Sequence, residues 1–210
     1  MRKTLWLLLF FVLVSYGLAI YFYPSMPAMI ASHWNSQGQV NGHLPRFWGL
    51  FGLPFLITGL WILFLVIPLI DPLKKNIKKF LAYYDLLVLV IILFLLYVYV
   101  LTIVWNLGIT YNMNALIVPA FAVLFLIMGF IMRKSRRNWF VGIRTPWTLS
   151  SDYVWKKTHT LASILFMIAA FVSLISLFLP TYTFYIFVAA VVLAALIPAI
   201  YSYVLFARRR

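Results

Sequence analysis

The sequence contains no cysteine, and only three of its 210 residues are acidic. Without thiols, the chain cannot form disulfides, use a cysteine nucleophile or build a zinc–thiolate site. Charged residues of both signs make up only 10% of the sequence, whereas 66% is hydrophobic. Soluble domains are nearer half apolar and a quarter charged, and a chain of this length buries at most about 70% of its unfolded surface. The composition therefore excludes an ordinary soluble enzyme, and its hydrophobicity excludes an intrinsically disordered chain.

Six apolar runs approach or exceed the ~20 residues that a helix needs to cross about 30 Å of hydrocarbon. Backbone groups in lipid must pair within their own segment, which favours helices. Three of the runs contain a proline, Pro54, Pro119 or Pro198, that is expected to kink its helix. We therefore predict an all-α integral membrane protein with six transmembrane helices in three hairpins. The expected spans are 5–23, 48–70, 83–105, 115–132, 161–179 and 184–206.

The positive charges are sorted along this predicted topology. Sixteen of the seventeen Lys and Arg residues fall on one side, and Arg46 alone falls on the other. The positive-inside rule then places the N- and C-termini in the cytoplasm and the protein in the plasma membrane. Attraction to anionic membrane lipids explains the net charge of +14 without a nucleic-acid partner. The sixteen are Arg2, Lys3, Lys74, Lys75, Lys78, Lys79, Arg133, Lys134, Arg136, Arg137, Arg144, Lys156, Lys157, Arg208, Arg209 and Arg210.

The predicted outer loop, residues 24–47, is one of two connections rich enough in aromatic and polar residues for recognition. Asn35–Gly38 is expected to form a turn, and Asn41-Gly42 a second one, because Asn and Gly tolerate positive φ. His33 and Trp34 are then expected at the apex. Such a loop either anchors at the lipid headgroups through its Trp or recognises an exterior ligand. With no acidic residue on this side, an apolar or neutral ligand fits better than a cationic one.

The second rich connection is the predicted inner motif, residues 133–160. Gly142 and Pro146 indicate a bent segment, and Ser150 or Ser151 is expected to cap the helix that follows. That helix places Trp155 and His159 on one face at positions i and i+4. The segment either anchors the bundle at the interface, or docks a cytoplasmic partner and closes the bundle.

The pattern Asn138-x-x-x-Gly142-Ile-Arg-Thr-Pro-Trp-Thr-Leu149, followed by Trp155 and His159, resembles the signature of the SdpI family. The outer loop is similar to the N-terminal domain that often accompanies that family, with Arg46 at a position where Lys is usual. We therefore expect an N-terminal hairpin domain at 1–80 and an SdpI-like domain at 81–210. The inner residues that carry the resemblance are Asn138, Gly142, Arg144, Thr145, Pro146, Trp147, Thr148, Trp155 and His159. The outer ones are Pro24, Pro27, His33, Trp34, Asn35, Gly38, Gly42 and Arg46.

The resemblance implies a six-helix membrane protein of the immunity or receptor type. Proteins of this family are associated with protection against a secreted sporulation-delay peptide toxin. The resemblance also implies recruitment of a cytoplasmic transcriptional repressor to the membrane. The expected partners are therefore membrane lipids, a secreted peptide outside and a repressor inside.

No catalytic, cofactor or metal site is predicted. Asp85 is the one acid within a span, where it either pairs with Lys78 or Lys79 or acts as a functional buried acid. Asp152 and His159 share a helix face but are about 10.5 Å apart along it, too far for a catalytic triad. The two histidines of the outer loop lack a third ligand. A small membrane enzyme or transporter acting on a lipid or peptide, and a structural scaffold, remain as alternatives.

Overall fold

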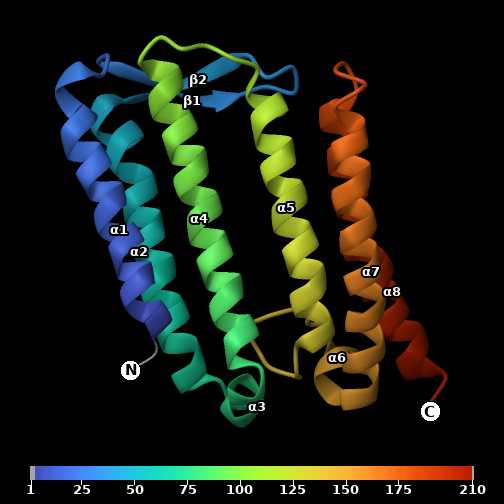
Figure 1. Ribbon diagram of the computed structural model, residues 1–210. Coiled ribbons are helices and arrows are strands. Elements are labelled where there is room, and N and C mark those ends of the chain that lie inside the picture. The colour runs from blue at the N-terminus through green and yellow to red at the C-terminus, as the bar shows by residue number, and fades with distance from the viewer. Residues whose placement is uncertain (1–2, 210) are drawn as a thin grey trace. The chain divides into compact units, whose positions relative to one another are not determined.

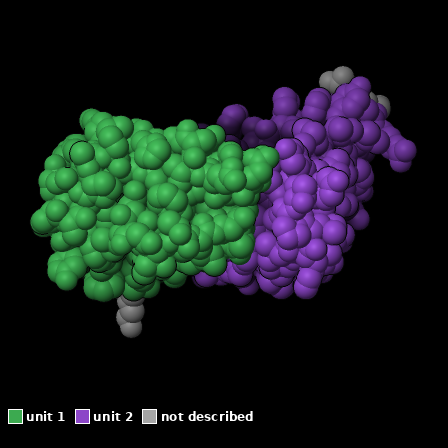
Figure 2. Space-filling view, turned by 90° about the horizontal axis from the view of Figure 1, so that it is seen from above, with its two compact units in different colours: residues 1–64, 88–117 green, residues 65–87, 118–210 purple. Residues whose placement is uncertain are grey.

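The computed structural model describes residues 3–209. The chain forms two compact units, coloured green and purple in Figure 2. Unit 1 comprises Met1–Phe64 and Val88–Ile117, and unit 2 comprises Leu65–Leu87 and Val118–Arg210. The boundaries between the two units fall within three of the long helices. The units therefore do not coincide with the predicted domains 1–80 and 81–210, and that division remains a prediction. The predicted cytoplasmic residues Arg2 and Arg210 lie outside the described residues.

The prediction of six membrane-spanning helices is confirmed. The fifth begins nine residues before the predicted apolar run, because the capped helix expected from the inner motif continues into the membrane span without a break. The helices long and apolar enough to cross a membrane, among the described residues, are Thr4–Ser25, Arg46–Ile70, Leu81–Asn106, Met113–Lys134, Asp152–Ser176 and Thr183–Ala207.

Unit 1 combines helices with a small sheet that the sequence analysis did not predict (Figure 1). After α1 (Lys3–Phe22) and a 3-10 turn, η1 (Tyr23–Ser25), the strands β1 (Met29–Trp34) and β2 (Val40–Pro45) pair antiparallel. Most of α2 (Arg46–Ile70) and α4 (Leu81–Asn106) follows. Apolar residues beneath the strands form the core of this unit: Ala19, Met26, Ile30, Leu50, Tyr99 and Ile103.

The predicted second turn at Asn41-Gly42 is wrong. Both residues lie in β2, where Gly42 pairs with His33. A Cβ on Gly42 would lie 2.9 Å from the Cβ of His33, so this glycine serves close approach of the strands and not a reversal of the chain. The first predicted turn is confirmed, since the Gly38 N–H donates to the Asn35 carbonyl at 2.9 Å.

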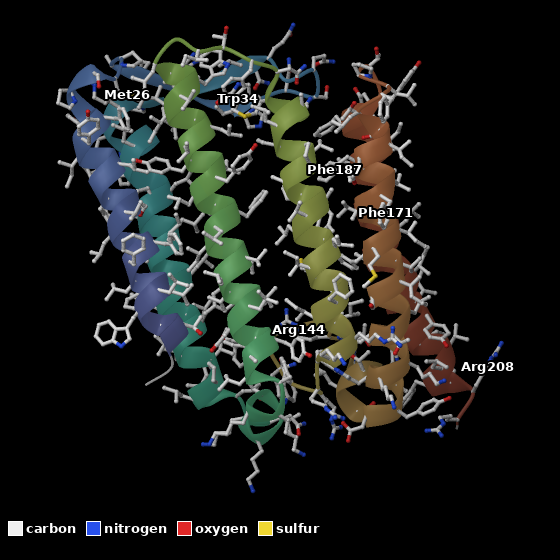
Figure 3. The ribbon with its side chains drawn as sticks, viewed as in Figure 1. Met26, Trp34, Arg144, Phe171, Phe187 and Arg208 are labelled. Atoms are coloured by element: carbon white, nitrogen blue, oxygen red, sulfur yellow. The ribbon has the colours of Figure 1, made fainter. Side chains whose placement is uncertain are left out.

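Unit 2 contains α3 (Lys74–Lys79), most of α5 (Met113–Lys134), α6 (Pro146–Ser150), α7 (Asp152–Ser176) and α8 (Thr183–Ala207). Small side chains allow α5, α7 and α8 to approach closely, as is usual for helices packed in lipid. Phe125 meets Phe166 edge-to-face at 5.8 Å between ring centroids. On α7, Phe171 is 60% exposed, as expected of a surface in contact with lipid (Figure 3). The buried core residues are Ala122, Phe125, Met132, Ala162, Phe166, Ala169, Ala170 and Ala194.

Candidate functional site

The basic segment, as we call residues 133–160, folds around the side chain of Asn138. This residue is fully buried, and its amide makes four bonds to the main chain. The Nδ2 group donates to the carbonyls of Arg136 and Val141 at 2.8 and 3.0 Å. The Oδ1 atom accepts the N–H groups of Phe140 and Val141 at 3.0 and 2.6 Å. Asn138 therefore fixes the path of an irregular loop that has no secondary structure of its own to pair its backbone.

Two polar residues of the α2–α3 region attach to the same loop. Asp71, 1% exposed, accepts the N–H of Leu73 at 2.6 Å through one oxygen and that of Trp139 at 2.9 Å through the other. Asn76 donates to the Arg137 carbonyl at 2.9 Å. The sequence analysis missed both residues. Asp71 follows its apolar run directly and is one of only three acids, a signal that could have marked it.

His159 supports the loop from α7. Its Nε2 atom accepts the Ile143 N–H at 3.0 Å, and its Nδ1 atom lies 2.8 Å from the Trp155 carbonyl. A nitrogen that accepts carries no proton, so this geometry assigns a neutral imidazole protonated at Nδ1. The Trp155 indole stacks on the imidazole at 4.0 Å between centroids, which confirms that the two residues share a helix face.

Gly142 passes directly over this imidazole. Its φ is +108°, a conformation that favours glycine. A Cβ at this position would lie 2.4 Å from His159 Nε2 and 3.4 Å from the Trp155 ring. Residue 142 must therefore be glycine both for its backbone conformation and for the contact that it makes.

The Thr-Pro-Trp-Thr part of the motif starts α6. Thr145 is the N-cap: its hydroxyl accepts the Thr148 N–H at 3.1 Å, and the Thr148 hydroxyl accepts the Thr145 N–H at 2.9 Å. Pro146 occupies the first turn, where a missing N–H costs nothing. Two contacts join this turn to α8, a hydrogen bond of 2.9 Å between Thr145 and Ser202 and the packing of Trp147 on Tyr203.

The surface of the basic segment carries its cations. Arg144 is exposed and donates to the main-chain carbonyl of Trp139 at 2.9 Å, and Trp139 is itself 50% exposed. Arg137 forms an ion pair with Asp152 at 2.9 Å and donates to the Leu149 carbonyl. Among the predicted inner residues, Asn138, Thr148, Trp155 and His159 are buried, whereas Arg144 and Pro146 are exposed. Arg144 forms an exposed pair with Trp139, which was not among the predicted residues, and this pair is available to a partner.

Most of the predicted outer residues lie in the hairpin, as we call residues 29–45, and Pro27 and Arg46 flank it. The prediction that His33 and Trp34 form the apex is wrong, because both lie in β1 and pair with β2. At the tip of the hairpin, Asn35 Oδ1 accepts the N–H groups of Gln37 and Gln39, both at 3.0 Å. Gly38 has a φ of +76°, and a Cβ there would lie 2.4 Å from the amide of Asn112. Asn112, in the α4–α5 connection, donates to the Gln37 carbonyl, and Asn114, in the first turn of α5, donates to the Ser36 carbonyl.

The end of α4 holds the first strand of the hairpin. The Asn106 side chain accepts the Ala31 N–H at 2.8 Å and donates to the Ala31 carbonyl at 3.0 Å. It thus makes the pair of hydrogen bonds that a further strand would make at this position. Trp34 packs edge-to-face on Trp105 at 6.0 Å between centroids. His33 is exposed and lies 2.5 Å from the amide oxygen of Asn41.

Arg46 closes the base of the hairpin. Its Nε donates to the Pro27 carbonyl at 3.3 Å, and its guanidinium lies 5.4 Å from the centre of the Tyr23 ring. Its backbone N–H donates to Ala28. Arg46 thus contacts the connection that leads from α1 into the hairpin.

Asp85 lies half-buried in the first turns of α4, and it takes part in an interaction with another group. Among residues 3–209, no three His, Cys, Asp or Glu side chains are grouped as metal ligands.

Both sets of residues fall within segments that match known families. Residues 134–202 match the SdpI/YfhL protein family, and residues 10–58 match a Domain of unknown function (DUF1648). The predicted SdpI-family resemblance is confirmed. Immunity protein SdpI of Bacillus subtilis (strain 168) is 27% identical over 193 residues, which cover 91% of this chain and 90% of that protein. No solved structure matches the chain.

The SdpI-family match begins at the end of α5 and contains every predicted inner residue, whereas the match to the domain of unknown function contains every predicted outer one. Six spanning helices together with this similarity make the chain a multi-pass protein of the plasma membrane. The family similarity thus covers the two connections in which side chains bond most extensively to the main chain.

Proposed function

We propose that this chain is a membrane immunity protein that protects the cell from a membrane-active peptide arriving from outside. The observation that carries the proposal is the similarity to Immunity protein SdpI, which extends along 91% of the chain and includes both the hairpin and the basic segment. A common architecture over both connections supports a common role, because loops carry most recognition in membrane proteins.

The proposal places the hairpin outside the cell and the basic segment in the cytoplasm. Three spans lie between them in the chain, so they face opposite sides of the membrane. The basic segment contains seven cations and the hairpin none. The positive-inside rule therefore favours this orientation.

The hairpin and the turn of α2 that follows it offer an apolar surface. Met29 is 52% exposed, Leu44 43% and Trp48 56%. Exposed apolar side chains next to a membrane suit a peptide that itself partitions into lipid. The sequence up to residue 70 contains no acidic residue, so recognition by this surface would depend on apolar contact.

Signalling to a cytoplasmic repressor is the finer part of the proposal. Arg144 and Trp139 form the exposed pair of the basic segment, and Arg and Trp are both common anchors in protein interfaces. A peptide bound outside can change this surface only if it binds two conformations with different affinity, with about 1.4 kcal/mol for each tenfold difference.

The immunity proposal is tested by expressing the chain in a Gram-positive strain that is sensitive to the sporulation-delay peptide toxin. Survival in the presence of the peptide should exceed that of cells with the empty vector. The variant Met29→Asp/Leu44→Asp, which places charge on the apolar surface, should lose protection, whereas Gln37→Glu at the polar tip should keep it. Survival at the vector level, with membrane expression confirmed, would reject the proposal.

The signalling proposal is tested by the location of a fluorescently tagged repressor. Arg144→Ala should release the repressor from the membrane while expression and peptide resistance are retained. Lys75→Ala removes an exposed cation from α3 and serves as the matched control. Equal recruitment by both variants would assign the repressor to another surface, and no recruitment by the unaltered chain would reject signalling but not immunity.

A further inference from the structure

Unit 2 contains a polar cavity of about 510 Å³ where α3, the end of α5 and the beginning of α7 meet. This volume is within the range of small-molecule binding sites. Nitrogen-tipped side chains gather at this end of α5 and α7 in Figure 3. All the lining residues belong to unit 2: Asn76, Lys79, Arg133, Lys134, Ser135, Arg136, Arg137, Asp152, Tyr153, Trp155 and Lys156.

The charge of this cavity is unbalanced. Six of the described lining residues are Lys or Arg, and Asp152 is the one carboxylate. Asp152 pairs with Arg137 at 2.9 Å. Arg133 and Lys134 also lie in the last turn of α5, where cations stabilise the helix dipole. Lys79 has the same place in α3, but that role does not extend to Arg136 or Lys156, which bring further positive charge to the same concave surface.

Trp155 adds a buried donor to the wall of the cavity. Trp155 lines the cavity and is only 2% exposed, and its indole Nε1 has no hydrogen-bond partner among the described residues. The indole N–H can only donate, and leaving a buried donor unpaired is costly. The beginning of α7 adds the positive end of a 25-residue helix. A cationic wall, a helix N-terminus and an unpaired donor all select an anion with acceptor oxygens.

We propose that this cavity binds the phosphate group of an anionic lipid headgroup. The lining residues of α5 and α7 are at the ends of two spanning helices, at the level where phosphates of the adjoining leaflet lie. Tyr153 and Trp139 are 41% and 50% exposed nearby, as in the aromatic belts of membrane interfaces. Basic pockets between membrane helices are suited to such headgroups. This site is separate from peptide protection and does not depend on the proposed function.

The test measures lipid binding to the full chain, purified in a neutral detergent, by native mass spectrometry. Phosphatidylglycerol should bind about tenfold more tightly than phosphatidylcholine of the same acyl chains, because the latter adds a cation to its phosphate. Arg133→Gln/Arg136→Gln should remove this preference. Lys75→Gln/Lys78→Gln removes the same charge from α3 without touching the cavity lining, and should leave it unchanged.

Trp155→Phe tests the indole donor. It should weaken phosphatidylglycerol binding about fivefold, as expected for one hydrogen bond, in samples whose unfolding temperature shows that the fold is retained. The proposal would be overturned if Arg133→Gln/Arg136→Gln and Lys75→Gln/Lys78→Gln reduced the preference for phosphatidylglycerol equally. It would also be overturned if the unaltered chain bound the two lipids equally. Competition by inorganic phosphate as effective as that by lipid would keep an anion site but overturn its lipid source.

Discussion

At the scale of single residues, the basic segment is organised by buried polar side chains that bond to main-chain groups. Asn138 makes four such bonds, and His159 and Asp71 make two each. Asn138, Asp71 and the Nε2 atom of His159 thereby pair backbone groups of a segment that has no regular secondary structure to pair them. The motif identified in the sequence therefore serves mainly to fix the fold of this loop, and Arg144 and Trp139 are exposed on its surface.

Gly142→Ala should destabilise the protein by about 1–3 kcal/mol, because it combines backbone strain with a clash against His159. Gly108→Ala is the matched control: Gly108 has a φ of +101° but nothing within 4 Å of an added Cβ. Thermal unfolding in detergent, followed by intrinsic fluorescence, should show the larger decrease for Gly142→Ala. An equal decrease in the two variants would mean that backbone strain alone explains the glycine.

Sequence patterns could identify residues whose roles are local. Gly142, Trp155 and His159 contact one another within one short stretch of the chain, so their spacing was informative. Asp71 acts on Trp139, 68 positions away, through a main-chain N–H that every non-proline residue has. No side-chain pattern marks such a partner, so the sequence could single out Asp71 as a rare acid but could not identify Trp139 as the residue that it bonds.

At the scale of elements, the six long helices were predictable because the hydrocarbon thickness sets their length and apolar content. The hairpin was not. Its strands have six residues each, contain polar side chains and a glycine, and lack a sustained alternation. Asn41-Gly42 is moreover a common turn pair. The hairpin is stabilised by residues far away in the sequence, among them the Asn106 amide, 75 positions from Ala31.

Asn106→Asp should release β1 from the end of α4. The aspartate keeps the shape of the side chain but replaces the Nδ2 donor by an oxygen that faces the Ala31 carbonyl. Hydrogen exchange at residues 29–45 should become faster, while that of α7 is unchanged. Gln37→Glu makes the same chemical change at an exposed position of the tip and should have no effect. If hydrogen exchange at residues 29–45 were equally slow in Asn106→Asp and Gln37→Glu, other contacts would hold the hairpin.

At the scale of the whole molecule, the distribution of charge is the strongest information in the sequence. The chain carries a net charge of +14, and one of its cations, Arg46, falls in the connection after the first span. Each charge that would have to cross the hydrocarbon opposes the reverse insertion. Orientation thus depends on many residues together, and no single substitution is expected to invert it.

The orientation can be measured because the chain has no cysteine of its own. Gln37→Cys, in the hairpin, should react with a membrane-impermeant maleimide in intact cells. Ser150→Cys, in α6, should react only after permeabilisation. Both positions are exposed in their units, so burial would not account for a difference. Labelling of both in intact cells would contradict the proposed topology.

The bond between the Asp71 carboxylate and the Trp139 N–H also bears on how the sequence can evolve. The carboxylate accepts a hydrogen bond from the main-chain N–H of residue 139, so this bond does not depend on the side chain at that position. The fold should therefore tolerate any side chain at position 139 except proline, while position 71 should tolerate little besides aspartate. A saturation library at the two positions should retain many substitutions at position 139 and few at position 71.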